Sequence, residues 1–538
     1  MVFARRSTTL LAAIIASCAM VLSLTACTSD NKTVVDGQTT VTSNSAGGVA
    51  VFTPSDGITL NQQTPLNKWA KLVPDLAKAL ADAGFKKGDI NHTTSDSLDK
   101  QSRAIQDFVV DHLSNNTTDD SGIAIAPDNM TLLVAPVVEA DASTRQYGDY
   151  VSQNLSTNDA TDGEATSDGE SSEDDSSNTE SDSTASDEQA QAVDRLVSSL
   201  KLAKESGMHV VLLGNSIEGY KPDAFVKFSD AQTIGKLQAE KMVSKLKLDK
   251  ASKDNPKYIE VLLPYTAVDE KGNANDSTFA QEAFRGIWQV LGSYYQKGVV
   301  ESPSGTLDGK STENDWQAVA YDAAKEGSTA KVLDKRLAKT DGQSTLTRID
   351  GIITMNDYIA SEVVKELDDL GYTGSAADIN PQITISGIVG NITGKKDLSR
   401  DAVPDPIKSP ENDNANDSSS SDDDADEDTS ASDKDRDSQW PLVTGYGAYV
   451  SNIPSIVNGK QWMTGMEDRQ TIATDIAQAC AKLNKDEALN SMPSIRNSEV
   501  GGVKKIPTIS EPLLAVSASN LKSALIDPGY ISLADAGL

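Results

Sequence analysis

The stretch Gly48-Val49-Ala50-Val51-Phe52 is a short apolar run, and a helical hydrophobic pattern follows it after a loop. A continuous apolar run of this length is typical of a buried strand, whereas apolar residues three or four positions apart form one face of a helix. The stretch therefore predicts one β-α unit, whose helix ends near Gly84. The apolar positions of that helix are Trp69, Leu72, Val73, Leu76, Ala79 and Leu80.

The same unit recurs along the chain. Continuous apolar strands separated by amphipathic helices indicate parallel sheets that are covered on both faces. About ten units are too many for one small sheet, so we predict an α/β protein with two doubly wound parallel-sheet lobes joined by a hinge. Ligands of such sheets bind at the carboxyl ends of the strands. The further predicted strands are Thr131 to Val138, His209 to Leu213, Tyr258 to Leu263, Gly351 to Thr354 and Leu442 to Gly445, and the further helices are Val193 to Glu205, Thr233 to Leu248, Ala280 to Tyr295, Ile359 to Leu370 and Thr471 to Leu483.

Composition and charge exclude some function classes. The chain has 538 residues, 38% of them hydrophobic, and can bury a large core. Its formal charge of -32, from 48 Lys and Arg against 80 Asp and Glu, repels phosphates, so no nucleic-acid partner is expected. Two of the three cysteines, Cys18 and Cys27, lie near the N-terminus and leave only Cys480 for the body. The fold must therefore stand without disulfides.

The N-terminus has the features of an export signal. Arg5 and Arg6 precede the apolar run Leu10 to Leu24, which is too short for an ordinary transmembrane helix. The run ends in Leu24-Thr25-Ala26-Cys27, which resembles a bacterial lipobox, in which the thiol of Cys27 would carry the lipid. We predict a lipoprotein signal peptide over 1–27 and a flexible polar tether over 28–47, and no later segment is apolar enough to span a bilayer. An ordinary signal peptide with a chance cysteine is the alternative.

Two acidic segments have too little apolar surface to form a core. Ser156 to Gln189 contains 12 acidic residues and no Lys or Arg. Glu411 to Asp437 contains another 12 acidic residues, with Lys434 and Arg436 as its only basic ones. Such composition does not offset the entropy of ordering, so we predict two disordered insertions in a globular protein.

Motifs of catalysis and of metal binding do not occur in the sequence. His92, His112 and His209 are not spaced as zinc ligands, and Gly214 to Glu218 fails the G-x-S-x-G pattern at its last position. Gly394-Lys395 lacks the preceding glycine of a phosphate loop, and the acidic segments lack the glycine and the final glutamate of a calcium loop. We therefore predict a binding protein without cofactor or metal, and not an enzyme.

Several motifs in order along the chain resemble the type I periplasmic-binding-protein family, and especially the sugar-binding proteins of bacterial ABC importers for xylose, ribose and other monosaccharides. The resemblance implies lobe boundaries that the pattern of strands and helices does not give. The first lobe would comprise 48–229 and 467–510, and the second lobe 230–466 and 511–538. The motifs are Asn67-Lys68-Trp69, Phe228-Ser229-Asp230 leading into Gly235 to Ala239, Asp350-Gly351-Ile352-Ile353-Thr354-Met355-Asn356-Asp357, Pro441 to Gly445 with Ile456 to Gln461, and the closing Glu511 to Val516.

The resemblance also implies ligand contacts at particular positions. Asn356 stands where the family hydrogen-bonds a sugar hydroxyl, although it or Asp357 could instead cap the following helix. Trp69 matches an aromatic residue that faces a sugar ring, although it could instead belong to the core. The loop residues Asn275 and Asp276 could be contacts or solvated loop positions. The candidate ligand-binding residues are Lys68, Trp69, Asn215, Asp230, Asn275, Asp276, Asn356, Tyr446 and Glu467.

Three positions depart from the family. The family has an Asp-Arg pair where this chain has Gly214-Asn215, an Asp where it has Gly447, and a basic residue where it has Glu467. Each charge-assisted bond to a sugar hydroxyl contributes roughly 1.5 to 3 kcal/mol, so losing these anchors weakens a monosaccharide site. Either the ligand differs, with Tyr446, Trp69 and Trp462 as stacking surfaces, or the site no longer binds a sugar tightly.

Three hypotheses remain open at this point. The first is an extracytoplasmic receptor, anchored to the cell membrane through Cys27, that captures a monosaccharide or related solute and delivers it to the subunits of an ABC permease. The second is a sensor or structural lipoprotein that keeps the fold without the ligand. The third, an exported hydrolase, has no motif that supports it.

Overall fold

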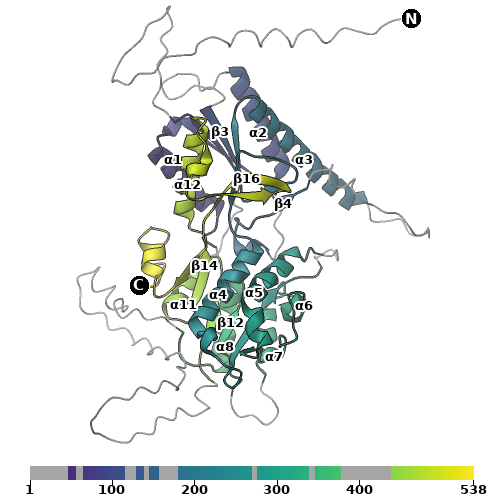
Figure 1. The fold of residues 1–538 in the computed structure, drawn as a ribbon, viewed down its shortest axis with the longest axis vertical. Helices are drawn as coiled ribbons and strands as arrows, with labels where there is room; N and C mark the ends of the chain where they lie inside the picture. Colours follow the sequence, from purple (N-terminus) through teal and green to yellow (C-terminus); the bar gives the residue numbers. More distant parts are fainter. Residues whose placement is uncertain are drawn as a thin grey trace, which may run out of the picture. The chain divides into compact units, whose positions relative to one another are not determined.

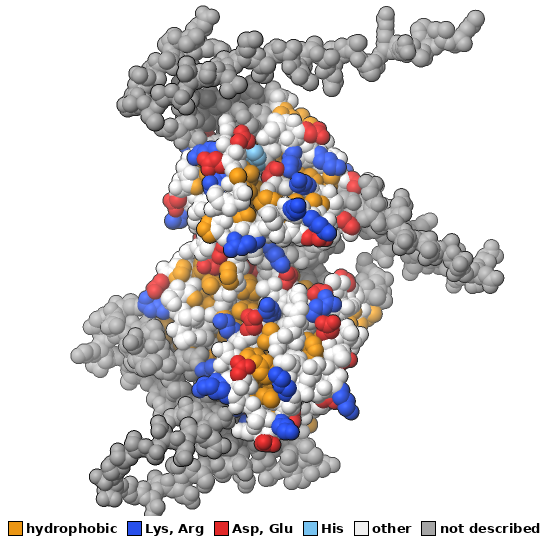
Figure 2. Space-filling view, viewed as in Figure 1, with side chains coloured by type: hydrophobic (Ala, Val, Ile, Leu, Met, Phe, Trp, Pro, Cys, Tyr) orange, Lys and Arg blue, Asp and Glu red, His pale blue; other side chains and the backbone are white. Residues whose placement is uncertain are grey.

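The computed structural model describes residues 46–55, 65–115, 129–138, 144–156, 180–268, 275–338, 346–376 and 438–538. The signal peptide, Cys27, the tether up to residue 45 and the acidic segment Glu411 to Asp437 lie outside the described residues. On the face drawn in Figure 2, basic and acidic side chains are interspersed over the described part. Among the described residues, none of the helices combines the length and the apolar character needed to cross a bilayer.

A seven-stranded sheet occupies one half of the described body (Figure 1). Its order is β15-β16-β7-β5-β3-β1-β2, and all neighbours are parallel except the antiparallel pair β15-β16. The edge strand β2 exposes four of its six residues, and an exposed edge accommodates polar side chains. The strands are β1 (Gly48–Pro54), β2 (Ile90–Ser95), β3 (Met130–Val134), β5 (His209–Leu213), β7 (Ala224–Lys227), β15 (Ile495–Val500) and β16 (Val503–Ser510).

Helices cover both faces of this sheet. Val49 and Val51 of β1 pack in one core with α1 and α12, whereas Ala50 and Phe52 pack in another core with α2 and α3. Successive side chains of a strand point to opposite faces, so this alternation shows that β1 is buried on both sides. Figure 1 shows α1 beside α12 and α2 beside α3. The helices are α1 (Trp69–Asp82), α2 (Leu98–Asn115), α3 (Glu180–Glu205) and α12 (Arg469–Leu483).

A second, four-stranded sheet has the order β10-β8-β12-β13 and is parallel throughout. Ile353 of β12 packs with α4 and α5, whereas its neighbour Ile352 packs with α7 and α8. This sheet is therefore also covered on both faces, which confirms the predicted α/β class. The strands are β8 (Lys257–Val261), β10 (Val300–Glu301), β12 (Gly351–Ile353) and β13 (Leu442–Thr444), and the helices are α4 (Ala231–Leu246), α5 (Thr278–Gln296), α7 (Ser328–Arg336) and α8 (Asp357–Leu370).

Within the described residues, the chain passes between the two sheets three times. It leaves β7 for α4 at Lys227 to Ala231, and it leaves β14 (Met463–Met466) for α12 at Met466 to Arg469. It returns from β16 to β17 (Leu514–Ser517), which pairs antiparallel with β14. We call the seven-stranded sheet with its helices the first lobe, and the four-stranded sheet with its helices and the β14-β17 pair the second lobe. The residue boundaries implied by the resemblance stay a prediction.

Several predicted elements end elsewhere than expected. The strand from Thr131 stops at Val134, because the buried side chain of Gln101 hydrogen-bonds the C=O of Ala135 and the N–H of Val137 in place of a neighbouring strand. Helix α3 begins at Glu180, so the prediction of disorder over Ser156 to Gln189 is wrong for residues 180–189. These residues lie at the N-terminal end of the helix predicted over Val193 to Glu205, and acidic residues are favoured near a helix N-terminus. Residues 157–179 of the segment lie outside the described residues.

Candidate functional site

Polar side chains gather where strands of both sheets end. Asn215 follows β5, Ser229 follows β7, Asn356 follows β12 and Tyr446 follows β13. All four residues are buried, with at most 3% of their surface exposed. Because the carboxyl ends of parallel strands lie at the same edge of a sheet, these positions are where a ligand of such sheets would bind.

A buried trio joins the two lobes at their crossings. The Oε1 atom of Glu467 accepts hydrogen bonds from the hydroxyl of Tyr446 at 2.5 Å, from the N–H of Ser229 at 3.3 Å and from the hydroxyl of Ser229. Glu467 lies between β14 and α12, and Ser229 lies between β7 and α4. Sequence reasoning noted Tyr446 and Glu467 but gave no role to Ser229, which stands in the quoted Phe228-Ser229-Asp230 motif.

The second carboxyl oxygen of Glu467, Oε2, is buried and lacks a hydrogen-bond partner among the described residues. Burial raises the pKa of Glu467, and the hydrogen bonds from Ser229 and Tyr446 oppose that shift only in part. Burial also raises the pKa of Tyr446, with the charge of Glu467 as the next cause. At this oxygen a protonated Glu467 can donate a hydrogen bond and an ionised one can accept it.

Asn356 serves as a helix cap, which is the alternative that the sequence left open. Its Oδ1 accepts from the N–H of Ile359 at 2.9 Å, at the start of α8. Its Nδ2 donates to Oε1 of Gln146 at 3.1 Å, 210 positions away in the chain. The preceding residue, Met355, has a φ of 67°, in the left-handed region that a residue with a Cβ adopts only at a cost. Hydrogen bonds to both ends of its amide, from Ile359 and to Gln146, thus fix the side chain of Asn356.

Asp357 is a buried carboxylate beside Asn356. Its oxygens accept from Gln461 Nε2 at 2.7 Å, from Thr464 Oγ1 at 2.8 Å and from the N–H of Tyr449 at 2.9 Å. Burial raises its pKa to about 6, although these hydrogen bonds favour the ionised form. Its contacts fix the loop after β13, which carries Tyr446.

Trp69 is a core residue. Only 2% of its surface is exposed, and its ring meets Tyr150 and Phe228 edge-on, with centroids 5.1 and 5.7 Å apart. This is the core alternative, and it follows from the position of Trp69 on the apolar face of α1, against the sheet. The neighbouring Lys68 pairs with Asp149 at 2.8 Å, and the backbone N–H of Trp69 donates to the same carboxylate at 3.1 Å.

The other candidates also have partners within the chain. Asn215 donates to the C=O of Pro136 at 2.9 Å and accepts from the N–H of Gln153 at 3.0 Å. Asp230 caps α4 through the N–H of Thr233 at 2.7 Å and pairs with Lys227. These contacts tie the two side chains to loops and to the start of α4.

The two loop candidates shape the start of α5. Asn275 donates to the C=O of Thr266 at 2.9 Å, and Asp276 accepts from the N–H and the hydroxyl of Thr278 at 2.9 and 2.7 Å. Asp276 is an exposed capping residue of the kind that often precedes a helix. The stacking candidate Trp462 is 6% exposed and packs in the core of the second lobe.

Backbone geometry favours glycine at positions 214 and 447. Gly214 has a φ of 70° and Gly447 a φ of 112°, both in the left-handed region that favours glycine. A Cβ at Gly447 would also lie 3.0 Å from the ring of Tyr449. An aspartate at either position would therefore strain this backbone, and the chain has no carboxylate there.

The structure adds residues that sequence reasoning missed. Gln146, Tyr147 and Asp149, from the connection between β3 and α3, contact Asn356, Tyr446 and Lys68. Only the motif Tyr147-Gly148-Asp149-Tyr150, an aromatic island in a polar connection, could have signalled them. Within the described residues, no cluster of His, Cys, Asp or Glu could hold a metal ion.

Neither a protein-family model nor a curated protein matches this sequence. Solved structures similar to this chain include solute-binding proteins of ABC transporters. One from Clostridium phytofermentans with bound β-D-glucose is 16% identical over 91% of this chain and 99% of its own, with a TM-score of 0.44. One from Chloroflexus aurantiacus in complex with D-glucose is 18% identical over 92% and 98%, with a TM-score of 0.43.

A third similar structure is an arabinose-binding protein from Geobacillus stearothermophilus, 9% identical over 89% of this chain and 99% of its own, with a TM-score of 0.41. All three TM-scores are below 0.5. The fold assignment therefore rests on the two parallel sheets and on the three crossings between them.

Proposed function

We propose that this chain is a lipid-anchored, extracytoplasmic solute-binding protein that captures a sugar-like solute between its two lobes and delivers it to an ABC permease. The observation that carries the proposal is the trio Ser229, Tyr446 and Glu467 at the lobe crossings, with Oε2 of Glu467 buried and unpartnered among the described residues. A buried carboxyl oxygen without a partner is costly for the fold, and a bound hydroxyl would satisfy it.

The polar groups at the strand ends favour a neutral, hydroxyl-rich ligand. Glu467 can donate or accept according to its protonation state, and Asn356 at the end of β12 carries an amide with both a donor and an acceptor. Sugar hydroxyls also donate and accept, so they can complement such a set. The aromatic rings of Tyr147 and Tyr446, whose centroids are 6.2 Å apart, add apolar surface of the kind that sugar rings contact.

The membrane part of the proposal rests on the sequence around Cys27. Cys27→Ala should move the protein from the membrane to the soluble fraction, because no other predicted segment of the mature chain is suited to hold it at a bilayer. Fractionation after a high-salt wash measures this, and Cys18→Ala is the matched control because it removes a cysteine from within the signal peptide. Retention of Cys27→Ala in membranes would contradict the anchor.

A second candidate function is a sensor or structural lipoprotein with no solute of its own. It is favoured by the pairing of Lys68, Asn215, Asp230 and Asn356 within the chain, and by glycine at positions 214 and 447. A chain that satisfies its own polar groups has less to gain from a ligand.

Thermal unfolding in a panel of monosaccharides, sugar acids and polyols separates the two functions. A solute at one hundred times its Kd stabilises the native state by about 2.7 kcal/mol, which shifts the Tm by a few degrees. A shift with at least one solute, lost in Glu467→Gln, supports the receptor. No shift with any solute at millimolar concentration would leave the sensor or structural function.

A further inference from the structure

The connection between β3 and α3 enters the region between the two lobes. Of this long connection, the structure describes residues 135–138 and 144–156, and the second part holds the short helix η3 (Thr144–Tyr147) and the two-residue strand β4 (Asn154–Leu155). Long connections with so little regular structure are uncommon in compact domains and are often functional. We refer to residues 146–150 as the latch segment.

The latch segment contacts the second lobe through two residues. The side-chain oxygen of Gln146 accepts from Nδ2 of Asn356 at 3.1 Å, and its backbone C=O accepts from the hydroxyl of Tyr449 at 2.7 Å. Tyr147 is 1% exposed, and its ring lies 4.7 Å from that of Phe279 in α5, measured between centroids. These partners follow β12 and β13 or begin α5, so the segment meets the carboxyl-end edge of the second sheet.

The same segment is fixed to the first lobe by its other end. Asp149 accepts from Lys68 Nζ at 2.8 Å and from the N–H of Trp69 at 3.1 Å, and its own N–H donates to the C=O of Asn67 at 2.8 Å. Gly148 allows this approach because its φ is 95°, and a Cβ there would lie 2.6 Å from the C=O oxygen of Asn67. The segment therefore bridges the two lobes, with Asp149 on the first and Gln146 and Tyr147 on the second.

We propose that the latch segment holds the two lobes together in the absence of solute. Nδ2 of Asn356 donates its hydrogen bond to Gln146. A solute bound at Asn356 would accept that same hydrogen bond. A solute that reaches Asn356 must displace Gln146, and the protein rests in a closed, self-occupied form rather than an open one. The Leu66 N–H to Gly447 C=O bond, 2.9 Å long, also joins the lobes, so releasing the latch shifts a population and does not separate the lobes outright.

The inference can be tested without any solute, so its failure is distinct from failure of the proposed function. Spin labels at Lys78→Cys in α1 and Lys335→Cys in α7 report the distance between the lobes, and both positions are exposed. The full chain would carry Cys18→Ser and Cys27→Ser, and Cys480 is buried with a thiol pKa raised by that burial, so it does not label.

The test variant is Gln146→Ala with Tyr449→Phe, which removes the two hydrogen bonds between Gln146 of the latch segment and the second lobe. The matched control is Gln281→Ala with Tyr295→Phe, which removes a Gln and a Tyr hydrogen bond of 2.7 and 2.9 Å inside the second lobe. Two lost hydrogen bonds should raise the ratio of open to closed molecules about tenfold in the test variant. Pulsed dipolar spectroscopy should then show a longer-distance population that the wild type and the control lack.

Each other outcome overturns the latch. Identical distance distributions in all three proteins would show that residues 146–150 do not set the lobe distance. The same longer population in the control would show general loosening of the second lobe. Far-ultraviolet circular dichroism verifies that every variant folds, and Gln146→Ala alone, whose side chain is only partly buried, is the milder variant should the pair unfold.

Discussion

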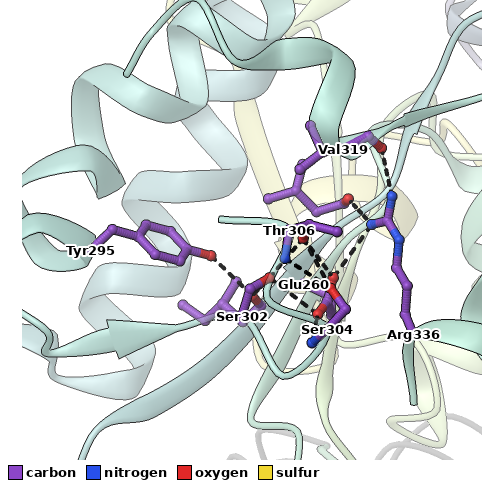
Figure 3. A network of polar contacts seen from close by, with 9 residues as sticks. Glu260, Tyr295, Ser302, Ser304, Thr306, Val319 and Arg336 are labelled. Atoms are coloured by element: carbon purple, nitrogen blue, oxygen red, sulfur yellow. Dashed lines mark hydrogen bonds and ion pairs between the residues drawn. The ribbon is translucent and has the colours of Figure 1, made fainter. Parts of the chain in front are cut away.

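Two buried glutamates, Glu260 in β8 and Glu467 between β14 and α12, have opposite polar surroundings. Both oxygens of Glu260 have partners: Ser302 and Ser304 on Oε1 at 3.1 and 2.8 Å, and Thr306 and Arg336 on Oε2 at 3.5 and 3.4 Å (Figure 3). Glu467 has all its donors on Oε1, none of them a cation, and Oε2 has none among the described residues.

The difference separates a stabilising network from a candidate site. A buried carboxylate with a cation and with hydrogen bonds to both oxygens is compensated within the fold. A buried carboxyl group with one oxygen that lacks a partner is not compensated in this way. Such a group is a candidate for function, because a ligand can supply the missing hydrogen bond. Asp357 is intermediate, since both of its oxygens accept hydrogen bonds but none of the donors is a cation.

The largest expected effect is on stability at Glu260. Glu260→Gln leaves the Arg336 guanidinium, whose side chain is 8% exposed, without its counter-ion and should cost about 3 to 5 kcal/mol of unfolding free energy. Glu467→Gln should cost less than about 1 kcal/mol, because no cation loses its partner. Urea unfolding measures both. Equal costs would remove the distinction between the two glutamates.

Asp357 should make stability depend on pH. Its folded-state pKa of about 6 exceeds its ordinary value of 3.8, so its stabilisation is fully present below about pH 4 and is lost as the pH rises through 6. Asp357→Asn does not titrate, and its amide oxygen can still accept from the N–H of Tyr449 and the hydroxyl of Thr464, which both donate to Oδ2 of Asp357. Between pH 4 and pH 7 the wild type should therefore lose about 3 kcal/mol relative to the variant. A constant difference between the two proteins would show that Asp357 titrates normally.

The backbone at position 447 does not accept a side chain without strain. Gly447→Ala places a Cβ at a φ of 112° and 3.0 Å from Tyr449, and it should cost about 1 to 3 kcal/mol. Gly309→Ala is the control, because a Cβ there meets only ordinary contacts at 3.5 Å or more, and it should lie within about 0.5 kcal/mol of the wild type. Equal stability of the two variants would mean that backbone strain does not explain the glycine.

The smallest effect is the pH dependence of Glu467→Gln. Burial raises the pKa of Glu467, so the wild type is favoured at low pH and loses stability as the pH rises through that pKa. The variant should match the wild type at pH 4 and exceed it slightly at pH 8, as measured by thermal unfolding at both pH values. The opposite sign would mean that unseen donors stabilise the ionised carboxyl.

Apolar pattern predicted most of the core elements. The strand His209–Leu213 has the predicted bounds, and α8 ends at Leu370 and is capped by Gly371, whose φ of 93° fits the predicted stop. The missed strand β2 is a polar sheet edge, so it has no apolar run. The hairpin β15-β16 turns at Gly501-Gly502, both with positive φ, and this Gly-Gly pair was a readable signal.

The site was less accessible to sequence reasoning. Asn356 and Tyr446 follow predicted strands, and the resemblance together with that position suggested them. Their partners Gln146 and Ser229 are about two hundred positions away, and no periodicity links residues that only tertiary packing brings together. The free oxygen of Glu467 depends on where every neighbouring donor points, which a sequence does not contain.

Isothermal titration of Glu467→Gln tests whether the Glu467 side chain binds the solute. Glu260→Gln is the control, because Glu260 is the other buried glutamate among the described residues. The solute is whichever member of the panel raises the Tm of the wild type. The account predicts that Glu467→Gln weakens its binding at least tenfold at nearly wild-type stability, while Glu260→Gln loses stability and keeps wild-type affinity at a temperature where it is folded. Wild-type affinity in Glu467→Gln, or no solute that binds the wild type at all, would contradict it.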